Sequence, residues 1–117
     1  MIEVFKALSE ESRLRILSLL LENEMCVCEI EATLKMTQSN ASRHLTALKN
    51  CGILDSYKVA QWAYYRIDDN FKQENAELWE YLQRKLIELP TYKVDREECR
   101  KCKGQNLCGC LNNKMFK

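Results

Sequence analysis

The sequence predicts a mainly α-helical chain with one small β-hairpin, and two observations carry this prediction. Only one proline and three glycines occur among the 117 residues, so few positions are reserved for helix breakers or special turns. Apolar residues recur at spacings of three and four in several segments, whereas the strand-favouring residues Trp62, Tyr64 and Tyr65 stand together in one short stretch. The length fits one domain of ordinary size.

Composition also excludes several classes of protein. No stretch reaches the roughly 18–20 apolar residues of a membrane span, and the N-terminus has neither the basic region nor the cleavage site of a secretory signal. We therefore expect a cytoplasmic protein with no membrane partner. Seven cysteines in such a protein indicate reduced thiols, because an odd number does not fit a disulfide framework. Clustered reduced thiols are candidate ligands for soft metal ions.

Two helices are predicted at the N-terminus, over residues 2–8 and 12–22. We expect Ser9 to cap the second helix by accepting a hydrogen bond from the Ser12 backbone N–H. The second helix carries one apolar stripe, formed by Leu14, Leu17, Leu20 and Leu21.

Two further helices, over residues 26–34 and 38–50, are separated by a tight connection of three residues. Thr37 is the expected N-cap of the second of them, and Gly52 is expected to supply the left-handed conformation after its end. The inward positions of this helix follow helical spacing and are Ala41, Leu45 and Leu48.

The remaining chain predicts a hairpin, a long helix and a tail. The hairpin pairs residues 53–58 with residues 62–67. The helix spans residues 70–89 and is stopped by Pro90. Its leucines at spacings of three and four form a seam for a partner helix.

Residues 91–117 are polar and lack periodicity, which predicts a cysteine-rich tail. We expect two units: a DNA-binding and dimerisation domain over residues 1–90, and this tail.

A net charge of +1 conceals a block structure. Residues 35–66 carry five basic side chains and one acidic side chain, whereas residues 1–34 and 67–98 each carry a net charge of −4. A basic block between acidic flanks fits the electrostatic footprint of a nucleic-acid-binding surface, and the alternative is an ordinary solvated face.

A short helix, a three-residue turn and a second helix with a polar face predict a helix-turn-helix that reads double-stranded DNA. Short hydroxyl and amide side chains near the second helix's N-terminus can approach base edges or phosphates in the major groove. The following hairpin would be a wing lying over the DNA backbone. The candidate DNA-binding residues are Gln38, Ser39, Asn40, Ser42, Arg43, His44 and Lys49 on the helix, and Lys58, Gln61 and Arg66 on the wing.

Residues 5–67 resemble the ArsR/SmtB family of winged-helix, metal-responsive repressors. The resemblance rests on residues 5–9 (FKALS), 12–17 (SRLRIL), 24–30 (EMCVCEI), 38–45 (QSNASRHL) and 62–67 (WAYYRI). It implies a dimeric winged helix-turn-helix protein, a homodimer that binds operator DNA without metal and releases it when metal binds.

The resemblance also places the dimer interface on the first helix and the helix over 70–89, with Leu78, Leu82 and Leu86 buried there and Trp79 as the anchor. Two positions depart from the family pattern. Glu11 stands where proline is usual, and the wing turn has no glycine.

Cys26 and Cys28 are candidate metal ligands in the predicted helix over 26–34. Residues i and i+2 of a helix lie about 200° apart around its axis, so the two sulfurs would point to opposite sides. One ion could bind both only if that turn unwinds, which would oppose metal binding to DNA binding. By resemblance, this Cys-x-Cys corresponds to the inducer site of arsenite-responsive and cadmium/lead-responsive members.

The ligands that complete the site are expected in the tail, from the same or the other subunit. Where one arsenite-responsive subgroup has a third cysteine, this chain has Glu31. The four tail thiols could alternatively form a site of their own, and Cys51 is expected to be a core residue. The tail candidates are Cys99, Cys102, Cys108 and Cys110.

These features predict a transcriptional repressor, not an enzyme, that responds to As(III) or Sb(III). The alternatives are a response to Cd(II), Pb(II) or Zn(II), or a redox switch of cysteine pairs. A second family metal site needs histidine on the last long helix, and the one histidine here, His44, lies elsewhere. A thiol oxidoreductase working through Cys99 and Cys102 would lack the βαβ context of such motifs.

Overall fold

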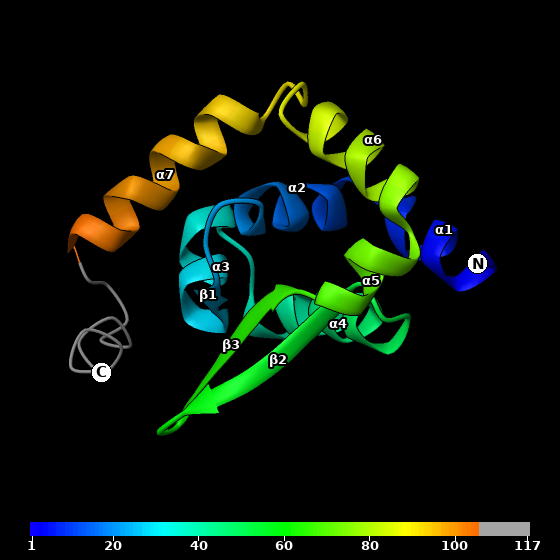
Figure 1. Ribbon diagram of the computed structural model, residues 1–117. Helices are drawn as coiled ribbons and strands as arrows, with labels where there is room; N and C mark the ends of the chain where they lie inside the picture. Colours follow the sequence, from blue (N-terminus) through cyan, green and yellow to red (C-terminus); the bar gives the residue numbers. More distant parts are fainter. Residues whose placement is uncertain (106–117) are drawn as a thin grey trace.

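The computed structural model describes residues 1–105, with the side chains of residues 1–102, and confirms a mainly helical winged helix-turn-helix fold (Figure 1). No helix among the described residues combines the length and apolar character needed to cross a membrane. The elements in chain order are α1 (Ile2–Leu8), α2 (Glu11–Leu20), β1 (Met25–Cys26), α3 (Val27–Leu34), α4 (Gln38–Asn50), β2 (Leu54–Val59), β3 (Trp62–Ile67), α5 (Asp69–Glu74), α6 (Ala76–Leu86) and α7 (Tyr92–Gln105).

The ends of α4 match the sequence prediction. The Thr37 hydroxyl accepts a hydrogen bond from the Asn40 backbone N–H at 3.2 Å. Gly52 has a φ of 90°, a left-handed conformation that glycine adopts without steric cost. These two residues bound the helix that presents the predicted DNA-reading side chains.

The predicted capping role of Ser9 is wrong. Its hydroxyl donates to the Lys6 carbonyl at 2.7 Å, so Ser9 closes the end of α1. Glu10 is the N-cap residue of α2, and its side chain makes no capping hydrogen bond.

A short strand, β1, precedes α3 and includes Cys26, which the sequence predicted as the first residue of the helix. It pairs antiparallel with β3, with Met25 opposite Tyr65 and Cys26 opposite Tyr64. The sheet order is β1-β3-β2, so β3 lies in the middle. The residues before α3 are thereby joined to the hairpin that forms the wing.

The single helix predicted over 70–89 is two helices, α5 and α6. The break is at Asn75, whose φ of −125° and ψ of 46° leave the helical region. Asp68 starts α5 by accepting hydrogen bonds from the backbone N–H groups of Asn70 and Phe71. The chain therefore turns before α6, which packs against α2 (Figure 1).

The leucines of α6 face the core of their own chain. Leu82 and Leu86 are 6% and 2% exposed and belong to the main hydrophobic core. Trp79 packs edge-on against Phe71, with ring centroids 6.4 Å apart. The predicted seam of leucines for a partner subunit is therefore largely an intrachain contact, with α2 as its neighbour.

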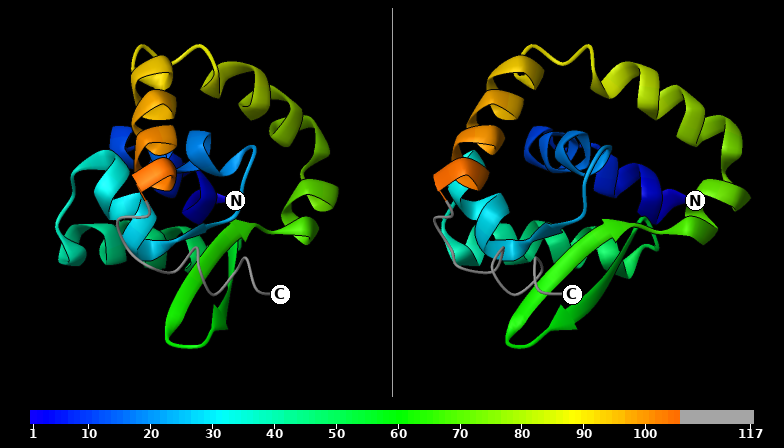
Figure 2. Two further views of the ribbon diagram at one scale, coloured as in Figure 1. Left: turned by 90° about the vertical axis from the view of Figure 1, so that its left-hand side faces the viewer. Right: turned by 60° about the vertical axis from the view of Figure 1, so that its left-hand side comes forward.

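The first part of the predicted tail is a helix, α7, which runs back over α2 and alongside α3 (Figure 2). The Asp95 carboxylate is 2% exposed and accepts two hydrogen bonds from Arg15 of α2, at 2.9 and 2.8 Å. This hydrogen bonding raises the pKa of Arg15. A bidentate pair of this kind fixes both distance and orientation, so it docks α7 on the domain.

Replacing Asp95 by asparagine removes the negative charge that pairs with Arg15. It also leaves only one oxygen to accept the two hydrogen bonds that Arg15 donates. We expect Asp95→Asn to lower the free energy of unfolding by roughly 2 kcal/mol in urea denaturation, less than for a fully buried pair because Arg15 is partly exposed. The control is Glu97→Gln, which breaks an exposed pair with Arg100 and should change the stability by less than about 0.5 kcal/mol. Equal stabilities for the two variants would contradict this role of Asp95.

Candidate DNA-binding face and thiol site

Helix α4 presents a polar, positively charged face to solvent. Within α4 the residues Ala41, Leu45 and Leu48 are fully buried, which turns the opposite side outward. The helix has no acidic side chain, so nothing on it repels phosphates. Six of the seven predicted residues on this helix are exposed: Gln38, Ser39, Asn40, Ser42, Arg43 and Lys49.

His44 is the exception, because it is 5% exposed and points toward α2. Its Nδ1 lies 3.2 Å from the Arg13 Nε, which donates to it, and 3.1 Å from the Glu10 Oε2. Burial and the neighbouring charge of Arg43 lower the pKa of His44, which Glu10 only partly offsets. The predicted base contact of His44 does not fit this geometry, and the side chain instead links α4 to the start of α2.

On the wing, Lys58 and Gln61 are exposed near the two-residue turn between β2 and β3. Arg66 is also exposed but lies at the far end of the hairpin, where its guanidinium is 3.2 Å from the Asp55 carboxylate and 3.9 Å from that of Glu24. The hydrogen bond that Arg66 donates to Asp55 lowers the pKa of that carboxyl group. Lys58 and Gln61 are thus open to solvent near the tip of the wing, whereas Arg66 is engaged with carboxylates.

The wing is also tied to the loop before β1. The Tyr57 hydroxyl donates to the Glu24 carboxylate, and the Arg66 guanidinium lies 5.4 Å from the centre of the Tyr57 ring. Burial and the bond to Glu24 raise the pKa of Tyr57 to about 12, so the hydroxyl keeps its proton. Residue spacing gave no signal for this contact, since the two partners are far apart in the sequence.

The two sulfurs of the Cys-x-Cys motif lie together, contrary to the prediction. Cys26 is the N-cap of α3 and has an extended backbone, with a φ of −72° and a ψ of 149°. The Cys26 and Cys28 Sγ atoms are 3.0 Å apart. Because Cys26 stands outside the helix, no turn has to unwind before one ion can contact both sulfurs.

The start of α3 is also held in place by a capping contact. The Glu29 carboxylate accepts a hydrogen bond from the Cys26 backbone N–H at 2.8 Å. The N-terminal end of a helix favours negative charge, and thiolates are the forms of cysteine that ligate metals. Cys28 is disulfide-bonded in this structure, so the pair supplies two thiolate ligands to a soft ion once that bond is reduced.

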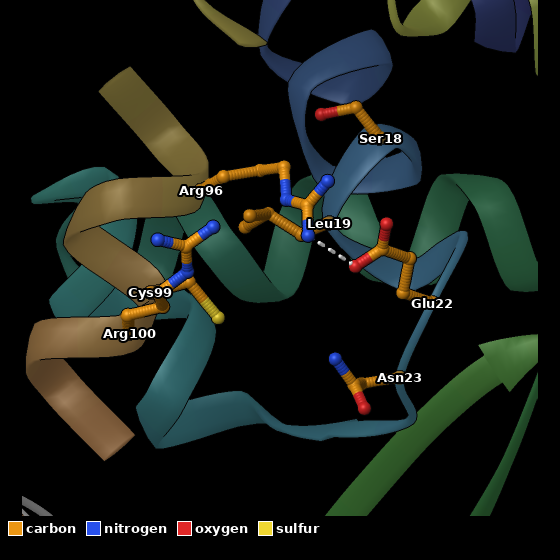
Figure 3. A pocket seen from close by; sticks show the side chains of 7 residues that line it. All are labelled: Ser18, Leu19, Glu22, Asn23, Arg96, Cys99 and Arg100. Carbon is orange, nitrogen blue, oxygen red and sulfur yellow. Dashed lines mark ion pairs between the residues drawn. The ribbon is translucent and has the colours of Figure 1, made fainter. Parts of the chain in front are cut away.

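Two of the predicted tail ligands lie on α7. Cys99 and Cys102 are 8% and 7% exposed and, three residues apart, share one face of the helix. Cys99 borders a pocket between α7 and α2, where Arg96 pairs with Glu22 at 2.7 Å (Figure 3).

No three histidine, cysteine or acidic side chains come together as a metal site within the part of the chain that the structure describes. Cys99 and Cys102 therefore do not join Cys26 and Cys28 there. The predicted ligands Cys108 and Cys110 lie outside the described residues. Cys51 is half-buried, and its thiol donates to the Leu48 carbonyl at 3.3 Å, which fits the packing role expected for it.

Comparisons with known proteins agree with this arrangement. Residues 10–56 match the family described as "Bacterial regulatory protein, arsR family". The arsenical resistance operon repressor of Escherichia coli K12 is 33% identical over 112 residues, which cover 92% of this chain and 94% of that protein. A cadmium resistance transcriptional regulatory protein of Staphylococcus aureus, a CadC homolog, is 40% identical over 76 residues, covering 64% of this chain and 63% of that protein.

Among solved structures, a homodimeric winged helix-turn-helix DNA-binding domain of Mycobacterium bovis is 34% identical to this chain. It is described as part of a possible ArsR-family transcriptional regulator. The match has a TM-score of 0.61 and covers 70% of this chain and 73% of that chain.

Lowering the pH should destabilise the protein through His44, its only histidine. The folded state resists protonation because the His44 pKa lies below its ordinary value of 6.5, while the unfolded chain takes up a proton near that pH. The free energy of unfolding of the unmodified protein should therefore fall between about pH 7.5 and pH 5 more steeply than that of His44→Gln. Parallel pH profiles in urea denaturation would contradict this.

Arg43 is the exposed cation nearest the middle of α4, so its removal should weaken DNA binding. With a duplex selected from a random pool by the metal-free protein, we expect Arg43→Ala to cost about 1–3 kcal/mol in affinity. A loss spread over all sequences, with a smaller salt slope, would indicate a phosphate contact. The control Arg84→Ala removes an exposed charge from α6, and an equal loss there would contradict the placement of the DNA-binding face.

Proposed function

The chain belongs to the ArsR family of bacterial transcription regulators, and we propose that it is a metalloid-responsive repressor. In this proposal a metal-free homodimer binds double-stranded operator DNA in the cytoplasm. It releases the DNA when As(III) or Sb(III) binds thiolates that include Cys26 and Cys28.

The observation that carries the proposal is the 3.0 Å separation of the Cys26 and Cys28 sulfurs at the start of α3. Thiolates are the ligands that soft ions select. Helix α3 packs directly against α4, the helix with the exposed polar face. A ligand on this pair is therefore adjacent to the DNA-binding unit and can favour one of two arrangements of it.

A complete site needs at least one more thiolate, because trivalent arsenic prefers three. We propose that it comes from Cys108 or Cys110 of the same or the partner subunit, or from Cys99 or Cys102 of the other copy in the dimer. Packing of α7 against α3 supports this source, since it places residues 92–105, which precede Cys108 and Cys110 in the sequence, beside the helix that begins at the pair.

Exposed apolar side chains support the homodimer. Ile2 and Phe5 of α1 are 67% and 54% exposed, and Tyr81 of α6 is 50% exposed. A second subunit covering α1 and the outer side of α6 would bury them.

The DNA-binding residues proposed for each subunit are Gln38, Ser39, Asn40, Ser42, Arg43, Lys49, Lys58 and Gln61.

The alternative inducers are Cd(II), Pb(II) or Zn(II), which accept three or four thiolates. The 40% identity to a cadmium resistance regulator favours keeping this alternative. A redox switch, in which cysteine pairs are oxidised, uses the same thiols without a metal.

The test measures the fluorescence anisotropy of the selected duplex while arsenite or cadmium is added to the reduced dimer. We expect arsenite to release the DNA, and Cys26→Ser and Cys28→Ser to weaken that release at least about tenfold. Cys51→Ser is the matched control, because serine keeps the hydrogen bond to the Leu48 carbonyl, and it should respond like the unmodified protein.

Separate replacement of the 99/102 and 108/110 cysteine pairs identifies the completing ligands. Release by cadmium alone would contradict the arsenic assignment. Release by peroxide but not by metal would instead establish the redox switch. An unchanged response in the Cys26→Ser, Cys28→Ser double variant would refute the proposed site.

A further inference from the structure

The thiol pair lies among the side chains of the wing. Cys26 is buried in a small cluster with Val59, at the end of β2, and Tyr64, in the middle of β3. The half-buried residues packed against this cluster are Cys28, Tyr57 and Trp62. The main core is formed by other residues, so Cys26 and Cys28 are packed chiefly against the hairpin.

Backbone pairing adds a second connection. Cys26 of β1 lies opposite Tyr64 of β3, and Tyr64 lies opposite Tyr57 of β2. The two tyrosine rings stack with their centroids 5.5 Å apart. One row across the sheet thus runs from the sulfur of Cys26 through Tyr64 to Tyr57.

Tyr57 provides a second contact between the hairpin and the segment that carries Cys26. Its hydroxyl donates to Glu24, two residues before Cys26. The hairpin is therefore attached to the loop and strand that carry the first sulfur at two points, the strand pairing and this hydrogen bond.

From these contacts we propose that the wing is the part of the DNA-binding surface that responds to a ligand on Cys26 and Cys28, with Tyr57 as the positioning residue. This inference rests on the proposed function, because it requires a thiophilic ion at that pair. Movement of the wing takes the place of the unwinding of α3 that the sequence predicted. The two sulfurs already lie together, so that unwinding is unnecessary.

The physical step is an expansion of the cluster. Two sulfurs bound to one ion through bonds of about 2.3 Å lie about 3.4 to 3.8 Å apart, for pyramidal to tetrahedral geometry, whereas here they are 3.0 Å apart. Close-packed side chains do not absorb such a change locally. Tyr64 and Val59 must shift, and the Tyr57–Glu24 bond makes the hairpin move with them, carrying Lys58 and Gln61 away from DNA.

The first experiment asks whether the wing senses the ligand. The chain has two tryptophans, Trp62 in the cluster and Trp79 in the main core. On titration of the reduced dimer with Cd²⁺, we expect the tryptophan emission to change in step with thiolate-to-metal absorption, and this change to be absent in Trp62→Phe. The Trp79→Phe variant should retain it. A ligand-dependent change that persists in Trp62→Phe would overturn the proposal.

The second experiment asks whether the wing transmits the response to DNA. Tyr57→Phe keeps the ring and removes the bond to Glu24. We expect its arsenite affinity and its metal-free DNA affinity to stay within about twofold of the unmodified protein, while the arsenite-induced loss of DNA affinity shrinks about fivefold. The control is Tyr92→Phe, which removes a hydroxyl that accepts a hydrogen bond from Arg96 on α7 and should leave the response unchanged.

The two proposals fail in different ways. Thiolate-to-metal absorption that does not depend on Cys26 and Cys28 would refute the thiol site itself. Absorption that depends on both cysteines, together with a full DNA response in Tyr57→Phe, would leave the site intact and refute the wing as its output. That result would assign the response to the contact between α3 and α4.

Discussion

The position of one residue, Cys26, outside helix α3 is the constraint on which the rest of the structure depends. Pairing of Met25 and Cys26 with β3 keeps this stretch extended, so α3 begins one residue later than helical periodicity suggests. The extended backbone turns the first sulfur toward the second, and the same pairing packs both against the hairpin. The position of the ligand site beside the wing is a consequence of a single two-residue strand.

The local part of the fold could be predicted from the sequence because local interactions determine it. The Thr37 cap and the left-handed Gly52 are recognisable from residue type and place the ends of α4. The break at Asn75 was missed because the apolar spacing continues across it, and propensity alone does not forbid asparagine in a helix. Helix α7 was missed because a bidentate pair between Arg15 and Asp95, 80 residues apart, holds it in place.

The candidate site likewise has features that the sequence predicts and features that depend on contacts between distant residues. Helical spacing correctly placed the exposed face of α4, since burial of Ala41 and Leu45 determines it. Spacing could not reveal that His44 turns inward, because its partners Glu10 and Arg13 lie on another element. Nor could it reveal that Arg66 is engaged by carboxylates. In each case a long-range polar contact, which has no signature in one sequence, decides what a side chain can reach.

Amide hydrogen exchange of the dimer, with and without Cd²⁺, tests the central claim most directly. If the sulfurs are already placed for a ligand, the amides of Val27–Leu34 should keep their protection when the ion binds, while those of β2 and β3 change. Loss of protection throughout α3, with an unaltered hairpin, would mean that the helix unwinds around the ion and would contradict this account.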